Sequence, residues 1–112
     1  LVLGASSLAA QTATNTTLLV WDQPNVTVAA AAQALVFRIF ADGAVTGTAL
    51  KGVTCAVLTS VVCQVPFPAF TPGAHTLQLT ASNTAGESPR SAVFAFTFVV
   101  VPSAPFNIRT VP

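Results

Sequence analysis

The chain has 112 residues, of which 53% are hydrophobic and only 6% are charged, with a formal net charge of +1. This length suits one domain with a single core, and four basic residues are too few for a surface that binds nucleic acid. No apolar run reaches the roughly 18 residues that a membrane-spanning helix needs, so no span is expected. A surface rich in hydroxyl and amide groups but poor in charge favours a secreted or assembled β-protein.

The segment Leu1–Gln11 is apolar and rich in small residues, and Ser7-Leu8-Ala9 or Leu8-Ala9-Ala10 is typical of a signal-peptidase site. We therefore interpret it as the remnant of a secretory signal, with an ordinary first strand or N-terminal tail as the alternative. The domain itself is predicted over residues 12–101, and the Thr-rich stretch up to Thr17 is expected to be a leader.

The first predicted strand is Thr17–Trp21, which ends at Asp22-Gln23-Pro24 because proline has no N–H for the ladder. Alternation places Leu19 and Trp21 on the same face, so Trp21 is expected in the core, with a surface ligand-stacking role as the alternative. The Ala-rich connection Asn25–Ala34 could form a helical turn, but it has no capping residue, so no full helix is predicted there.

The next strand, Leu35–Phe40, carries Phe37 and Ile39 on one face and ends at an Asp42-Gly43 turn. Two short strands follow, at Thr48–Cys55 and Cys63–Val65.

Cys55 and Cys63 are the two cysteines of the chain, and their even number and short spacing favour a disulfide. A metal site is a poor alternative, because two sulfurs and one distant histidine do not make four ligands. A disulfide would indicate a location outside the cytoplasm. The loop between them, Ala56–Val62, is unusually apolar, which predicts either a contact with another molecule or a loop folded back on the sheet.

The clearest strand is His75–Ala81, which follows a Pro72-Gly73 turn. Its core face is predicted to carry His75, Leu77 and Leu79, and its polar face Thr76, Gln78 and Thr80.

The last strand, Val93–Val101, places Phe94, Phe96 and Phe98 on one face, which we interpret as a core face. After it, residues 102–112 begin as a linker and end in an alternating run that includes Phe106 and Ile108. This run is either the first strand of a following domain or a tail that adds to the sheet of this domain or of a neighbour.

Six or seven short strands, frequent turn residues and no helix predict an all-β fold, an antiparallel β-sandwich. The predicted core comprises Trp21, Phe37, Ile39, His75, Leu77 and Leu79.

Several of these residues form a pattern that resembles the fibronectin type III domain, an immunoglobulin-like sandwich. The pattern consists of Phe70-x-Pro72-Gly73, the run from Ala81 to Ser88 (ASNTAGES), Trp21 with Pro24, and the pair Phe37 and Ile39. The resemblance covers residues 16–101 and implies binding through loops, here the loop that carries Asn83, Glu87 and Arg90. It also implies that His75 replaces the family's corner tyrosine as a hydrogen-bond donor, whereas the cysteine bridge is not a general family feature.

The sequence offers little catalytic chemistry. Asp22, Asp42 and Glu87 stand at turns or strand ends in separate parts of the chain, and the single histidine has no evident relay partners. We find no phosphate-binding loop or metal-ligand cluster, so no enzyme activity, cofactor or metal is expected.

Two functions therefore compete. The first is a secreted or cell-surface interaction or spacer module that binds a protein partner through the loop carrying Asn83, Glu87 and Arg90. The second is a structural subunit of an extracellular or viral assembly, in which the terminal strand pairs with neighbouring copies. Carbohydrate binding is a weaker alternative, because Trp21 is expected inside and Phe40 with Phe67 makes a poor stacking surface.

Overall fold

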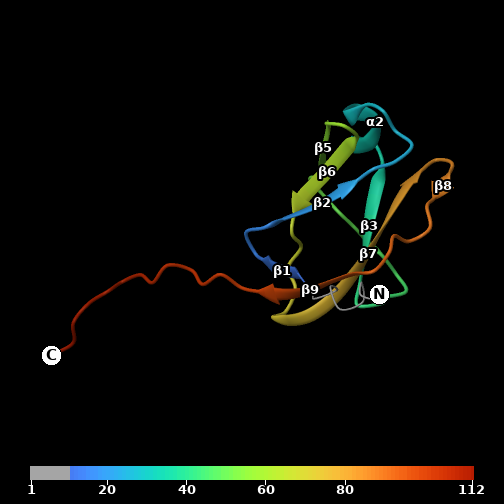
Figure 1. Cartoon of the computed structure of the whole chain (residues 1–112). Helices are drawn as coiled ribbons and strands as arrows, with labels where there is room; N and C mark the ends of the chain where they lie inside the picture. Colours follow the sequence, from blue (N-terminus) through green and yellow to red (C-terminus); the bar gives the residue numbers. More distant parts are fainter. Residues whose placement is uncertain (1–10) are drawn as a thin grey trace, which may run out of the picture.

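A computed structural model describes residues 11–112 of the chain. The predicted signal remnant therefore lies outside the described residues, except for Gln11, which begins the first strand. The strands are β1 (Gln11–Thr14), β2 (Leu18–Asp22), β3 (Val36–Ala41), β4 (Thr48–Ala49), β5 (Thr54–Val57), β6 (Val61–Pro66), β7 (Gly73–Asn83), β8 (Gly86–Glu87) and β9 (Phe94–Val99). One short helix, α2 (Ala29–Gln33), lies between β2 and β3 (Figure 1).

The strands form two sheets, which confirms the predicted all-β, sandwich-like fold. The large sheet has the order β1-β9-β7-β3-β4, with β8 paired to β7, and the small sheet has the order β2-β6-β5. All pairs are antiparallel except β1 with β9, which is parallel. The strands β2 and β5 are therefore the edges of the small sheet.

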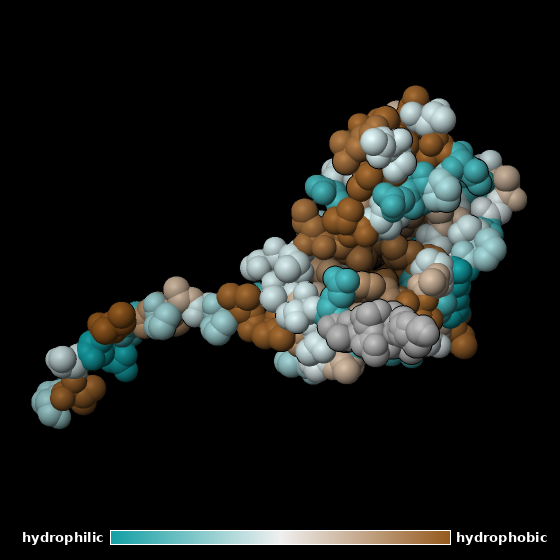
Figure 2. Space-filling view, viewed as in Figure 1, coloured by the Kyte–Doolittle hydropathy of each residue, from teal (hydrophilic) through white to brown (hydrophobic). Residues whose placement is uncertain are grey.

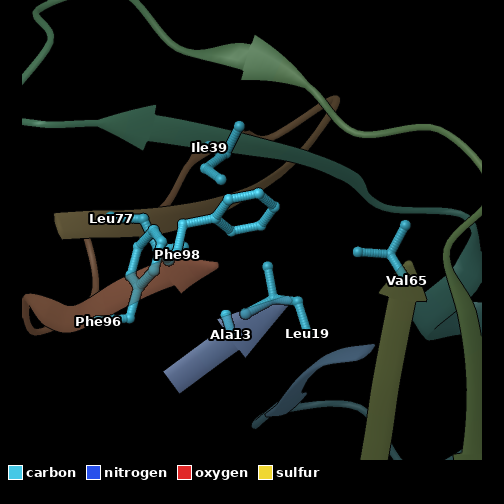
Figure 3. Close-up of a cluster of buried hydrophobic side chains, with 7 residues drawn as sticks. All are labelled: Ala13, Leu19, Ile39, Val65, Leu77, Phe96 and Phe98. Atoms are coloured by element: carbon cyan, nitrogen blue, oxygen red, sulfur yellow. The ribbon is translucent and has the colours of Figure 1, made fainter. Parts of the chain in front are cut away.

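The main core lies between the two sheets. Leu19 and Val65 reach it from the small sheet, and Figure 3 shows them with the side chains that enter from the large sheet, Ala13, Ile39, Leu77, Phe96 and Phe98. All seven are at most 7% exposed. The predicted core face of the last strand is thus confirmed for Phe96 and Phe98, while Phe94 is partly buried against the same cluster.

A second cluster connects the sheets near α2. It contains Ala32, Phe37, Val61 and Cys63, each at most 2% exposed. Trp21 packs against both clusters, and its ring meets that of Phe37 edge-on at 5.0 Å. This geometry is favourable for aromatic pairs and places Trp21 against the core, as predicted.

The predicted core residues differ in how deeply they are buried. Phe37, Ile39 and Leu77 are fully buried, whereas Trp21, Leu79 and His75 are partly buried. Trp21 and Leu79 are partly exposed because they line an opening between the two sheets.

The prediction that Gln11–Thr17 is only a leader is wrong. Residues 11–14 form β1, which pairs with residues 96–99 of β9. Only Ala13 of this strand is buried, at 4% exposure. The polar sequence QTAT therefore has no clear strand pattern, and its pairing with β9 determines that it is a strand.

The predicted strand Thr48–Cys55 is in fact two strands on different sheets. β4 pairs with β3 of the large sheet, whereas β5 pairs with β6 of the small sheet. Between them Leu50 and Val53 pack against the core, and Gly52 has φ 77°, a left-handed conformation that suits glycine. The chain therefore crosses from one sheet to the other here.

The turn at Asp42-Gly43 is confirmed. Both residues have positive φ, 53° and 74°, and the N–H of Ala44 donates to the carbonyl of Ala41 at 3.0 Å.

The helical turn that the Ala-rich connection could form is present as α2, which is five residues long. The helix α2 has no side-chain N-cap, and its stability comes from packing, because Ala32 is fully buried against the small sheet. The side chain of Gln33 accepts a hydrogen bond from the N–H of Cys55 at 2.7 Å. α2 thereby covers the edge of β5.

The outer face of the large sheet is less polar than alternation predicts. Phe40 is 6% exposed there, covered by Gly47 and by the guanidinium of Arg90, which lies 3.8 Å from the ring centroid. Thr80, assigned to the polar face, is 4% exposed, and its hydroxyl donates to the carboxylate of Glu87.

Candidate functional site

A cleft of about 580 Å³ opens between the two sheets along β2. Figure 2 shows a hollow on this face, bordered by hydrophobic side chains. Its walls come from β2, from β7 and from the segment between β8 and β9. The apolar lining consists of Leu18, Leu19, Val20, Trp21, Phe37, Phe67, Leu77, Leu79 and Phe94. A cleft of this size and character is typical of a site that binds a ligand or a chain segment.

One wall of the cleft is a sheet edge. The N–H of Phe67 donates to the carbonyl of Thr17, and the N–H of Gln23 donates to the carbonyl of Val61. Because antiparallel strands alternate between bonded and non-bonded pairs, the odd-numbered residues of β2 face β6. The backbone groups of Leu18, Val20 and Asp22 therefore point away from β6, and no strand within residues 11–112 pairs with them.

The opposite wall is closed by serine side chains. The hydroxyl of Ser91 accepts the N–H of Leu79 at 2.9 Å, and the hydroxyl of Ser88 accepts the N–H of Ala81 at 3.0 Å. The backbone N–H groups of the same two serines donate to the carbonyls of Leu79 and Ala81. Ser88 and Ser91 thus bond the N–H and C=O groups of Ala81 and Leu79 at this edge of β7, so these groups are not free to pair with another strand.

Trp21 lines the cleft and has a buried indole N–H with no acceptor within residues 11–112. A buried donor without a partner costs roughly 1–3 kcal/mol. The sequence predicted Trp21 in the core but did not predict that one side of it would border a cleft.

The predicted interaction residues Asn83, Glu87 and Arg90 lie at the end of the sandwich formed by the β7–β8 hairpin, and each makes an internal contact. The side chain of Asn83 accepts the N–H of Ala85 at 2.8 Å. Glu87 holds the hydroxyl of Thr80, and Arg90 covers Phe40 and donates to the carbonyl of Val45 at 3.2 Å. All three stabilise the hairpin and its surroundings.

A shallower depression of about 390 Å³ lies beside this hairpin. It is lined by the turn from Gln23 to Val26 and by residues 81–88. This end of the molecule therefore presents a second concave surface, lined by both apolar and polar residues.

His75 forms a cluster at the other end of β7. Its Nδ1 lies 2.8 Å from Asp42 Oδ2, and its Nε2 lies 2.7 Å from the carbonyl oxygen of Thr71 and 3.1 Å from the Thr71 hydroxyl. The bond to Asp42, followed by that to Thr71, raises the pKa of His75 above its ordinary value. The N–H of Thr76, followed by His75, lowers the pKa of Asp42.

The geometry of this cluster favours an imidazolium ion. Both ring nitrogens face acceptors, a carboxylate and a carbonyl, so the charged form, with a proton on each nitrogen, satisfies both contacts at once. A doubly protonated ring has no lone pair with which to act as a base. His75 therefore ties the turn at Asp42 to β7, in keeping with the hydrogen-bonding role predicted for it.

The two cysteines form the predicted disulfide. They lie directly opposite each other in the β5–β6 pair, and Cys63 is completely buried. The apolar loop around the bridge is shorter than expected, because β5 extends to Val57 and β6 begins at Val61. Val61 folds into the core, while Val57 and Leu58 are 54% and 69% exposed.

Residues 11–112 contain no group of three or more His, Cys, Asp or Glu side chains arranged to hold a metal ion. No helix in this part of the chain is long and apolar enough to cross a membrane.

The segment Pro102–Pro112 forms no strand and projects from the body beyond β9 (Figure 1). Phe106 and Ile108 are 88% and 89% exposed. The root of the segment is fixed, because the N–H of Val101 donates to the side-chain oxygen of Asn15 at 2.8 Å. Of the fates predicted for this run, pairing with the sheet of its own domain is not observed.

Comparisons with protein-family models, with curated proteins and with solved structures found no match for this chain. The resemblance to fibronectin type III domains therefore stays a prediction.

The residues that sequence reasoning missed are those of the cleft. The strand TLLVW carries Leu18 and Val20 on the face opposite Leu19 and Trp21, and a strand that is apolar on both faces indicates burial or contact on both. That signal could have identified β2 as an unusual edge.

Proposed function

We propose that this chain is a non-catalytic, extracytoplasmic β-sandwich module that assembles with neighbouring copies through the segment Pro102–Pro112. The observation that carries the proposal is the exposure of Phe106 and Ile108, alternate residues of a segment that pairs with no strand within residues 11–112. Exposed apolar side chains at regular spacing cost free energy in water and favour association.

The disulfide supports a location outside the cytoplasm, since such bonds persist mainly in oxidising compartments. The absence of catalysis is part of the proposal. It is supported by His75, the one histidine of the chain, whose two ring nitrogens are both directed at acceptors.

Size-exclusion chromatography with light scattering tests the assembly, using the full chain and a chain that ends at Val101. We expect the full chain to exceed the monomer mass in a concentration-dependent way and the shortened chain to remain monomeric. A full chain that stays monomeric at every concentration tested would reject the proposal.

A second candidate is binding of a protein partner through the end that carries Asn83, Glu87 and Arg90. The depression beside the β7–β8 hairpin favours it. Glu87 and Arg90 hold distant parts of the fold, whereas Asn83 bonds only within its own turn. The informative substitution is therefore Asn83→Ala combined with Thr84→Ala, two exposed residues at the tip. If a pull-down with wild-type protein captures a partner that this double variant captures equally well, the loop is not the binding surface.

A further inference from the structure

We propose that the cleft along β2 is the acceptor for the segment Pro102–Pro112 of a second copy of this chain, which docks there as an added edge strand. This inference rests on the proposed function and names the docking site for that segment.

Within residues 11–112, no strand pairs with the outer edge of the acceptor strand β2. The outward N–H and C=O groups of Leu18, Val20 and Asp22 can accept a guest strand, and the side chains of Leu18 and Val20 are 51% and 52% exposed. Natural edge strands are usually protected by lysine, proline, a bulge or a covering element. The other edge of the same sheet, β5, is covered in this way by α2 and Gln33. Among the elements that the structure describes, β2 is therefore the edge of this sheet left for pairing.

The donor has a side-chain pattern that fits this edge. In an extended conformation Phe106 and Ile108 lie on one side, and Asn107 and Arg109 on the other. On β2, the side chains of Leu19 and Trp21 lie on the core face of the small sheet, whereas those of Val20 and Asp22 lie on its outer face, at the rim of the cleft. A guest strand that turns Phe106 and Ile108 into the cleft therefore brings Arg109 to the face that carries Asp22, a favourable charge pairing.

The lengths also agree. β2 has five residues, and the alternating run from Phe106 to Thr110 has five, which corresponds to about 17 Å for each strand. Asn107 has φ 57° in this structure, so it must become extended on docking. The left-handed region is unfavourable for residues other than glycine and is only occasionally visited by asparagine, so the change to an extended conformation is not opposed by the backbone.

The projection of the donor favours a second copy as the acceptor. Asn15 holds Val101 at the turn that precedes β2, and Pro102 and Pro105 keep the residues before them extended. To reach its own β2, the chain would have to reverse sharply within this stiff stretch. Figure 1 shows it leading away from the body.

The test uses two matched proline substitutions in the full chain. Val20→Pro removes an outward N–H from β2, and Val57→Pro removes an outward N–H from β5, at the other edge of the same sheet. Neither N–H belongs to the β2–β6 or β5–β6 ladder, and both side chains are about equally exposed. Trp21 fluorescence and near-ultraviolet circular dichroism verify the fold of each variant.

We expect Val20→Pro to raise the concentration for half-assembly by at least about tenfold, because it deletes a pairing bond and adds a clash. Val57→Pro should leave that concentration unchanged. If wild type assembles and Val20→Pro assembles equally well, β2 is not the acceptor, although the proposed function stands. If the full chain is always monomeric, both proposals fail.

A second measurement does not depend on these variants. A labelled peptide with the sequence of residues 102–112 is added to the chain that ends at Val101, which retains every strand of both sheets, and fluorescence anisotropy is recorded. We expect saturable binding that is lost when Phe106 and Ile108 of the peptide are replaced by serine. Equal binding by the serine peptide would overturn the proposed docking. A monomeric full chain in which residues 102–112 are protected from hydrogen exchange would overturn it too, because the segment would then be docked on its own chain.

Discussion

His75 Nδ1 lies 2.8 Å from Asp42 Oδ2, and this pair joins β7 to the turn that follows β3, 33 residues earlier in the chain. Asp42 also accepts the N–H of Thr76 at 2.9 Å through its second oxygen. The side chain of His75 is 14% exposed and that of Asp42 is 51% exposed, so water reaches the pair from the aspartate side. The two residues therefore act as a clamp between neighbouring strands.

The clamp predicts a pH-dependent stability. The pKa of His75 is raised on folding, so its contribution is complete below the ordinary value of about 6.5 and is lost as the pH rises through the folded pKa. The pKa of Asp42 is lowered, so its contribution is present above about 3.9 and is lost as the pH falls through the folded pKa. We expect the clamp to stabilise most between about pH 4 and 6.5.

The measurement is the urea midpoint of unfolding at pH 5.5 and pH 8.5, for wild type and for His75→Gln. The wild-type midpoint should fall at the higher pH, and the variant should lose most of this fall, because the chain has a single histidine and both cysteines are in a disulfide. A variant that shows the same fall would mean that another group is responsible.

The disulfide predicts a loss of stability when it is removed. Cys55→Ala with Cys63→Ala opens a loop with a sequence separation of 8, which costs roughly 2.5 kcal/mol on the chain-entropy model. Cys63 is completely buried, so loss of its sulfur adds a small cavity. Denaturation in urea measures the change, and the reduced wild type separates the effect of the bond from that of the cavity. Equal stability of oxidised and reduced wild type would contradict the entropic account.

Alternation in the sequence predicted the strands in which one face is clearly apolar. β7 and β3 follow it closely, with Leu77 and Ile39 on the buried side. Such strands can be predicted from the sequence because the local hydrophobic pattern agrees with the burial in the fold. β1 cannot be predicted in this way, because Ala13 is its one buried residue. The position of β1 depends on pairing with β9, more than 80 residues away in the sequence.

The candidate site depends on the same kind of distant contact. Arg90 looks like a free loop residue in the sequence, but its guanidinium covers Phe40, 50 residues earlier. The cleft was missed for a related reason, because it forms only where β2 and the serine-closed edge of β7 lie side by side. The pattern of residues within one strand or loop does not show which distant segments will lie against it.

Gly47 predicts a steric effect on the outer face of the large sheet. A Cβ at this position would lie 2.7 Å from Phe40 Cζ and 2.9 Å from Cε2, closer than carbon atoms approach in proteins. Gly47→Ala should therefore destabilise the fold by about 1–3 kcal/mol, the usual cost of overpacking. A double-mutant cycle with Phe40→Leu checks the cause. If the cost of the alanine is unchanged in the Leu background, the Phe40 ring is not what the new methyl group meets.

The contact between Ser91 and Leu79 predicts that a side chain, and not a strand, bonds the backbone N–H at this part of the edge of β7. Its hydroxyl is the acceptor for the N–H of Leu79, so Ser91→Ala leaves that amide with water alone. The site is partly exposed, and we expect a loss of about 1 kcal/mol together with faster hydrogen exchange at the Leu79 amide. Ser103→Ala, a serine in the exposed segment beyond β9, is the matched control and should change neither quantity. Unaltered protection of Leu79 in Ser91→Ala would show that the hydroxyl is not its acceptor in solution, and the edge of β7 would then be available for pairing like that of β2.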